Sequence, residues 1–380
     1  MVGRGLPVGE DDPMDVVLDI VLILGGVVLV VAVLDSALRT FMLPRGAATP
    51  LTRIVFVSLR WCFSFVARDS HTYERRDRVM ALYGPVGLLA LTAVWMTLAI
   101  IGFAMIFFTL VPSRSVRVAF ELSGSSFFTL GFVLPPNDVP SFVLAFLEAA
   151  TGLTLLALLI AYVPTIYGAF SRRELAVAQL ATRAGTPPSA VELLERYHAI
   201  GWNDQLPVLW AQWELWFADI SETHTSLAIL TFFRSPSPER SWVTSAGAIL
   251  DAASLAQSTL AIPWSPQAGL CIRAGSLALR EIADYFDVDH DPDPMPDAPI
   301  SIAKEEFIEV YERLGGAGVP VRPDRERAWR EFAGWRVNYD AVLLALAGLT
   351  MAPYAPWSSD RSLRYRRPRL LPWGRSRRST

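Results

Sequence analysis

A run of small, aromatic and glycine residues holds the groups best suited to act on an ion. It reads Ser-Gly-Ser-Ser-Phe-Phe-Thr-Leu-Gly-Phe-Val-Leu-Pro-Pro over residues 123–136, and it lies between two long apolar segments. The pattern predicts a short helix, then an extended strand over residues 129–133 that stops at the prolines. Irregular backbone between two membrane spans is tolerated only where it is buried in protein or lines a water path. The predicted chemistry is therefore ion binding by backbone carbonyls in a pore.

At these residues the chain resembles the potassium-channel pore family, whose filter reads T-x-G-[YF]-G. Thr129, Gly131 and Phe132 match its first, third and fourth positions, and Val133 stands where the second glycine is expected. The resemblance covers roughly residues 84–170. It implies a homotetramer in which four loops point carbonyls and the threonine hydroxyl at a dehydrated ion. The ion-conducting filter it implies consists of Thr129, Leu130, Gly131, Phe132 and Val133.

Three functions remain open at this point. The first is a homotetrameric cation channel that conducts potassium. Because a β-branched Val133 resists the backbone angles of a filter glycine, a nonselective cation channel is the near alternative. A non-conducting membrane-anchored sensor or scaffold with a channel-like fold is the other. No assembled nucleophile, metal-ligand spacing or phosphate loop is evident, so we expect no enzyme, catalytic residue or metal site, and no cofactor besides potassium as the permeant ion.

The composition is typical of a membrane protein that carries a soluble part. Hydrophobic residues make up 52% of the 380 residues, and the mean hydropathy is +0.34. The 34 Lys+Arg and 37 Asp+Glu concentrate outside a few segments, and the net charge is −3. That charge argues against a bulk nucleic-acid-binding protein, so we expect no nucleic-acid partner.

Three segments are long and apolar enough to span a hydrocarbon core of ~30 Å. They cover residues 16–34, 83–111 and 139–167. Arginines crowd the connection after the first segment, and basic residues close to spans stay in the cytoplasm. We therefore predict a multi-pass protein of the cell membrane, with residues 1–35 forming an extracellular N-terminus and the first span. The C-terminal domain is predicted to be cytoplasmic.

The basic linker, residues 36–82, contains an apolar helix over residues 51–66 that could also be read as a fourth span. Three arginines recur on one face of this helix, which favours a position at the membrane surface. We predict that these arginines face lipid phosphates and that the aromatic residues face the acyl boundary. The residues concerned are Arg53, Arg60 and Arg68, and Trp61, Phe63 and Phe65. The linker and a basic tail, residues 359–380, are predicted to attract anionic lipids.

The predicted pore domain, residues 83–170, contains four parts. They are an outer helix (83–111), a pore helix (115–128) capped by Ser115, the filter (129–133) and an inner helix (139–167). The family resemblance makes Gly152 a candidate inner-helix hinge, and close packing through a small residue is the alternative. Glu148 is a membrane-embedded acidic residue, which is costly without a partner. It braces the back of the filter, lies near the vestibule, or extends to the interface.

Residues 171–358 are predicted to form an all-helical cytosolic domain with a regulatory or assembly role. Its helices are expected at residues 189–199, 205–223, 241–260, 268–286, 302–314, 324–332 and 337–349. Four aspartates alternate over residues 287–293, but glycine and glutamate are missing at the positions that a calcium loop requires. We interpret this run as a solvated loop. The predicted fold class is thus all-α: a pore-loop channel with one extra N-terminal span and a helical cytosolic domain.

Overall fold

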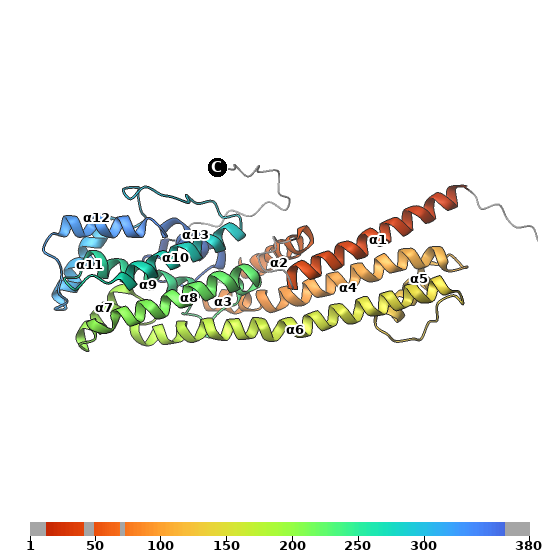
Figure 1. Ribbon diagram of the computed structural model, residues 1–380, viewed down its shortest axis with the longest axis horizontal. Coiled ribbons are helices and arrows are strands. Elements are labelled where there is room, and N and C mark those ends of the chain that lie inside the picture. Colours follow the sequence, from red (N-terminus) through yellow and green to blue (C-terminus); the bar gives the residue numbers. More distant parts are fainter. Residues whose placement is uncertain (1–12, 42–48, 69–72, 362–380) are drawn as a thin grey trace, which may run out of the picture. The chain divides into compact units, whose positions relative to one another are not determined.

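The computed structural model describes residues 13–41, 49–68 and 73–361. Of these residues, 76% lie in helices, and among them there is no β-strand. One isolated antiparallel bridge joins Leu260 and Val321. The prediction of an all-α protein is therefore confirmed (Figure 1). The acidic N-terminus before residue 13 and the basic tail beyond residue 361 lie outside the described residues, so the predictions made for them stay predictions.

The helices divide between two compact units. The first contains residues 13–41, 49–55 and 88–164, and the second contains residues 56–68, 73–87 and 165–361. The first holds α1 (Pro13–Phe41), most of α4 (Tyr83–Leu110), α5 (Val116–Phe127) and the first part of α6 (Val139–Ala184). The second holds most of α2 (Pro50–Arg68), α3 (Tyr73–Ala81) and the rest of α6. It continues with α7 (Ala190–Ala199), α8 (Leu206–Ser226), α9 (Trp242–Ser258), α10 (Pro266–Tyr285), α11 (Lys304–Gly316), α12 (Arg325–Arg336) and α13 (Asp340–Thr350).

Among the described residues, three helices are long and apolar enough to cross a membrane, the same number as the predicted spans. They are α1, the helical run Arg75–Leu110 that ends with α4, and α6. Within the first unit they lie side by side in Figure 1. Many of their large apolar side chains are exposed, as expected where lipid rather than water is the solvent.

Small residues and paired polar groups hold α1 against α4. A Cβ on Gly26 would lie 2.4 Å from the carbonyl oxygen of Gly102, so the two backbones touch where neither has a side chain. At the other end of this contact the Trp95 indole N–H donates to Ser36 Oγ at 3.1 Å. Asp19, the one charge within the first predicted span, forms an ion pair with Arg114. The Trp95 indole and the Asp19 carboxylate thus each have a partner.

The helix α6 is longer than the predicted inner helix. We predicted an inner helix over residues 139–167, whereas the helix continues through Pro164 to Ala184. Arg173 lies inside this longer helix, and its buried guanidinium donates to the carbonyl oxygens of Leu230 and Phe233. An arginine whose donors find acceptors can stay inside a protein core.

The basic linker helix α2 differs from the prediction in the direction of one arginine. Arg60 donates to the carbonyl oxygen of Leu349 at 2.6 Å, so it contacts protein rather than lipid phosphates. Phe63 likewise packs edge-on against Tyr83. Trp61 and Phe65 remain exposed and stack on each other, as a helix at a membrane surface would present them.

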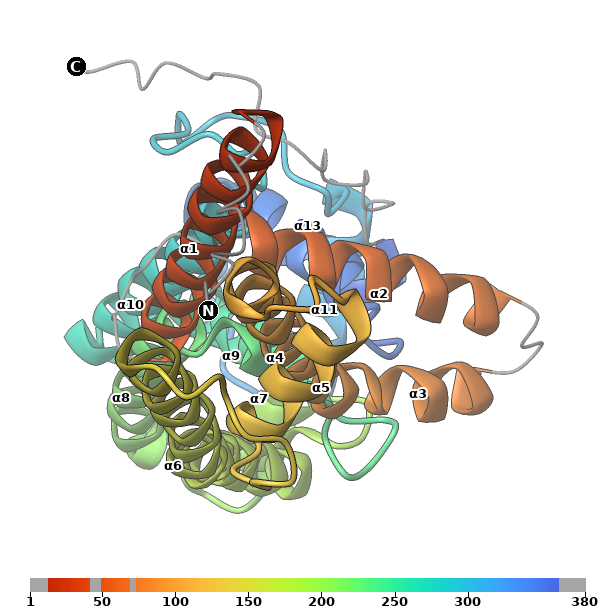
Figure 2. The same ribbon diagram turned by 90° about the vertical axis from the view of Figure 1, so that its right-hand side faces the viewer.

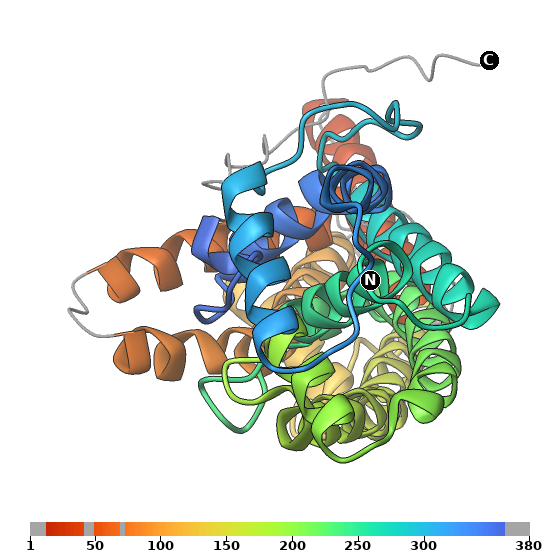
Figure 3. The same cartoon turned by 90° about the vertical axis from the view of Figure 1, so that its left-hand side faces the viewer.

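The core of the second unit forms around α9. Every residue of α9 is buried, and α7, α10, α12 and α13 lie against it. Figure 3 looks onto this unit, with its helices in green, teal and blue. The α9 sequence is rich in alanine, serine and glycine, so neighbouring helices approach closely on all sides.

A buried ionic network ties α12 and α13 to α9. Arg336 is fully buried and donates to Asp251 of α9, to Asp340 and to the carbonyl oxygen of Trp357. The Tyr339 hydroxyl donates to the same Asp251 at 2.9 Å. Attraction by these carboxylates keeps the pKa of Arg336 above its ordinary value despite burial. Losing one member would leave a buried charge without a partner, which is strongly destabilising.

The helices that follow α6 lie close to their predicted positions, with ends shifted by a few residues. The largest shift is at the last two helices, where α12 continues to Arg336 and α13 begins at Asp340. The buried Arg336 explains this shift, because α12 extends far enough to bring its guanidinium to Asp251. The aspartate run 287–293 forms a loop. Among the described residues no group of three or more metal-ligating side chains gathers.

The buried histidine of α8 predicts a pH-dependent stability. His224 Nε2 lies 3.2 Å from Arg173 Nη1, which can only donate, so this nitrogen accepts. Burial first, and the Arg173 charge second, lower the pKa of His224 well below 6.5. An unfolded histidine takes up a proton near pH 6.5 while the folded one does not. Stability is therefore retained above pH 6.5 and falls below it, by at most about 1.4 kcal/mol per pH unit.

We expect His224→Gln, whose side chain can still accept from Arg173, to flatten this slope between pH 6.5 and 5. Thermal unfolding followed by tryptophan fluorescence measures it. His198→Gln, at a half-buried position bonded to Asn203, is the control and should leave the slope in place. An unchanged slope in His224→Gln would contradict the assignment.

Candidate functional site

The helix α5 and the loop after it form the irregular part of the first unit. Figure 2 shows α5 beside α4 and α6. Ser115 precedes α5 with an extended backbone, but its side chain makes no capping hydrogen bond, so the predicted cap is wrong. The hydroxyl does not reach a first-turn N–H, although the residue occupies the N-cap position.

The loop after α5 is not the extended strand that we predicted. Thr129 has a φ of 55° and Gly131 has a φ of 71°, which are left-handed conformations that a strand excludes. The N–H of Thr129 donates to the Ser126 carbonyl, and that of Leu130 to the Ser125 carbonyl. The alternation of aromatic and small residues suggested a strand, but these tight turns end the helix instead.

The Ser125 side chain is hydrogen-bonded to the end of the loop, at Val133. Its hydroxyl oxygen accepts from the backbone N–H of Val133 at 3.2 Å. Val133 is half-buried and packs against the apolar cluster of the first unit that includes Phe103 and Leu122. The loop between Thr129 and Val133 is thus closed by one buried serine.

Most of the loop is uncovered in a single chain. The exposed fractions of Leu130, Phe132 and Leu134 are 61%, 67% and 78%. Apolar side chains and backbone polar groups therefore share one surface. Lipid is a suitable surrounding for the apolar side chains but not for the backbone polar groups, because an unpaired peptide group in hydrocarbon costs several kcal/mol.

Two residues of α6 contact two residues of α5 at matching helical spacing. Glu148 meets Ser123, and one turn later Gly152 meets Phe127. A Cβ on Gly152 would lie 2.3 Å from the Phe127 carbonyl oxygen. Of the two readings of Gly152, the structure shows close packing against α5.

Glu148 is fully buried rather than extended to an interface. Its Oε1 lies 2.5 Å from Ser123 Oγ, and that same Oγ lies 2.9 Å from the Ile100 carbonyl oxygen. A hydroxyl has one proton, so both contacts are hydrogen bonds at once only when Glu148 is protonated and donates to Ser123. Glu148 Oε2 has no hydrogen-bond partner in the described part of the chain. The three groups connect α6, α5 and α4.

The predicted site residues thus fall into two sets. Thr129, Leu130, Gly131 and Phe132 lie together in the exposed loop, whereas Val133 turns into the protein. Glu148 and Gly152 lie behind α5 and contact the loop only through it. Sequence reasoning missed Ser123 and Ser125, although three serines within four residues of an apolar region are a signal that polar bonds are needed there.

Comparison of the chain with protein-family models, curated proteins and solved structures finds no match.

The close contact at Gly152 predicts a strong effect of a single methyl group. Gly152→Ala forces α5 and α6 apart and should cost about 1–3 kcal/mol of stability. A lower thermal midpoint of the detergent-solubilised protein measures it. Gly168→Ala on the same helix is the matched control, because its Cβ meets only Arg172 Nη1 at 4.0 Å. Equal midpoints for the two variants would contradict the packing.

The Glu148 contact predicts a coupling to Ser123. In Glu148→Gln the amide can still donate to Ser123 Oγ, whereas in Glu148→Leu a side chain of similar size cannot. We expect the Glu148→Gln protein to be more stable than the Glu148→Leu protein by about 1 kcal/mol when Ser123 is present. The difference should vanish in Ser123→Ala, because the acceptor is gone. A difference that persists there would contradict the hydrogen bond.

Proposed function

We propose that this chain is one subunit of a homotetrameric cation channel that conducts potassium. The α5 helix would be its pore helix and residues 129–132 would line its ion path. The observation that carries the proposal is the loop: irregular backbone in a unit of membrane-crossing helices, exposed in one chain. Further copies of the chain would cover this surface and leave a water path between them.

The backbone of the loop supports ion binding. Thr129 and Gly131 have positive φ, while Leu130 and Phe132 do not. The N–H groups of Thr129, Leu130 and Val133 are bonded to residues of α5, so the loop's carbonyl groups are the backbone atoms available to an ion. Several carbonyls on one face, repeated around a symmetry axis, would replace the water shell of a cation.

The local charge favours a cation over an anion. Residues 128–138 contain no lysine or arginine, and their one charged residue is Asp138. The C-terminal end of α5 runs into the loop, and the partial negative charge of a helix C-terminus adds to that field.

Val133 favours a nonselective pore as the second candidate. It lacks the positive φ of Thr129 and Gly131, and its N–H is bonded to Ser125. The alternation therefore stops one residue short of the pattern in the resembling family. Fewer carbonyls would face the ion, which weakens discrimination between potassium and sodium.

The second unit would lie in the cytoplasm, because arginines crowd the segment that connects the first two spans. In this proposal it has a regulatory or assembly role. Anionic lipids would be partners of the basic linker through the exposed arginines of α3.

The decisive experiment reconstitutes the purified protein in bilayers and measures the reversal potential between potassium and sodium solutions. A reversal near the potassium equilibrium potential supports the selective channel, and one near zero supports the nonselective pore. Gly131→Ala should abolish or alter the current, because alanine resists a φ of 71°. Gly124→Ala is the matched control, since nothing lies within 4 Å of its added Cβ.

Two outcomes would contradict the proposal. Chemical crosslinking that saturates at dimers would exclude a four-loop ring. Absence of ion flux from vesicles that contain crosslinked tetramers, across a range of pH and calcium, would favour a non-conducting sensor or scaffold.

A further inference from the structure

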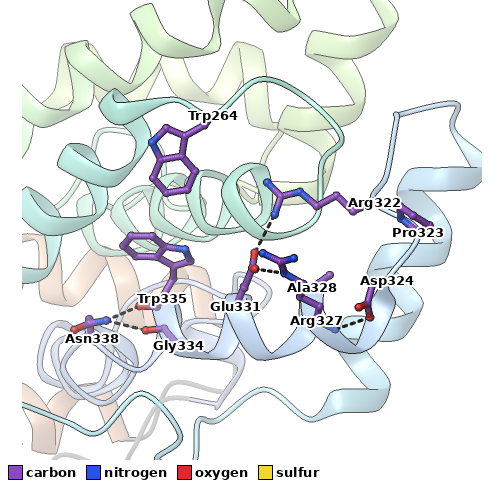
Figure 4. A pocket seen from close by; sticks show the side chains of 10 residues that line it. All are labelled: Trp264, Arg322, Pro323, Asp324, Arg327, Ala328, Glu331, Gly334, Trp335 and Asn338. Atoms are coloured by element: carbon purple, nitrogen blue, oxygen red, sulfur yellow. Dashed lines mark hydrogen bonds and ion pairs between the residues drawn. The ribbon is translucent and has the colours of Figure 1, made fainter.

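A cavity of about 780 Å³ lies in the second unit, beside α12. Its walls include Trp264, Arg322, Arg327, Glu331 and Trp335. This volume falls within the range of small-molecule sites, about 300–1,000 Å³. Figure 4 shows the two indole rings on one side of the cavity and the two guanidiniums beside them. Nothing in the proposed ion path uses these residues.

The two tryptophans have no aromatic or hydrogen-bonding partner for their side chains in the described part of the chain. Trp264 is 61% exposed, in the turn before α10. Trp335 is half-buried at the C-terminal end of α12. Two indole faces on one cavity present a stacking surface for a planar ring, and every nucleobase has such a face.

Most of the carboxylate oxygens on the charged wall already accept hydrogen bonds from the wall itself. Glu331 accepts from Arg322 Nη1 through one oxygen and from Arg327 Nε through the other. One Asp324 oxygen accepts from the Arg327 backbone N–H. The carboxylates are therefore largely committed within the wall.

Several donors of the arginines and tryptophans in the wall have no acceptor. Arg322 Nη2 and both terminal nitrogens of Arg327 have no acceptor among the described residues, and the same holds for the indole nitrogens of Trp264 and Trp335. Guanidinium groups with free N–H pairs match phosphate and carboxylate oxygens. The cavity thus offers donors to a ligand rich in acceptors.

The walls are held in place before any ligand arrives. The Arg322 N–H donates to the Thr259 carbonyl, and Arg322 Nε donates to the Leu260 carbonyl. Next to Trp335, Arg336 is anchored in the buried network with Asp251. A site built on fixed elements loses little entropy on binding.

We propose that this cavity binds a nucleotide, with its base against Trp264 and Trp335 and its phosphate on Arg322 and Arg327. A nucleotide combines a planar ring for the two indole faces with phosphate oxygens for the arginine donors that have no acceptor in this wall. The inference goes beyond ion conduction, and binding can be measured whether or not the protein conducts.

Equilibrium dialysis of the full-length protein in detergent with radiolabelled AMP tests the proposal. AMP should bind saturably, at one site per chain, and adenosine should compete more weakly because it lacks the phosphate. Trp264→Ala should weaken AMP binding about tenfold, through loss of one stacking face. Arg327→Ala should also weaken AMP but should leave the affinity for adenosine unchanged. Trp61→Ala, at an equally exposed tryptophan on α2, should have no effect.

Three results would overturn the proposal. The first is the absence of saturable binding of AMP, ATP, GMP and cyclic AMP at millimolar concentration. The second is nucleotide binding that Trp264→Ala leaves unchanged. The third is a smaller oligomer in Trp264→Ala, measured by light scattering, which would assign this tryptophan to a contact between copies.

Discussion

A peptide group without a hydrogen-bond partner is too costly to leave in hydrocarbon, and this constraint governs the first unit. The backbone groups of its helices are bonded within each helix, and Asp19 of α1 is paired with Arg114. The loop after α5 is the exception. Ser125 and the last turn of α5 bind some of its N–H groups, but the surface from Leu130 to Leu134 stays open in one chain. The proposal of a pore formed by several copies follows from that one incomplete surface.

The contact between α5 and α6 gives the loop its support. Gly152 brings the two backbones together, and Glu148 and Ser123 bond one turn away. The loop therefore follows a helix, α5, whose position is set by its contacts with α6. A loop held in this way can keep unusual backbone conformations such as the positive φ of Thr129, because the surrounding structure determines them.

In the second unit, by contrast, two buried arginines find acceptors inside the core. Arg336 and Arg173 each supply several donors to carboxylates or carbonyls inside the core. Buried ion pairs are weak evidence for stability, but they specify which helices meet. In this unit they join α12 and α13 to α9, and α6 to the segment after α8. Arginines that a composition count assigns to the surface thereby become part of the core.

The sequence by itself determined the all-helical class, the three apolar helices and the position of the helix and loop between the last two. These properties depend on local composition and on runs of apolar residues, which are readable along the chain. Only the tertiary structure decided the conformation of residues 129–133, the packing role of Gly152, the burial of Glu148 and the length of α6. Each of the last three depends on a partner in another helix or segment: Phe127 for Gly152, Ser123 for Glu148, and Leu230 for Arg173 of α6. Periodicity and charge carry no information about such pairs, because a buried arginine and a solvated one look the same in a sequence.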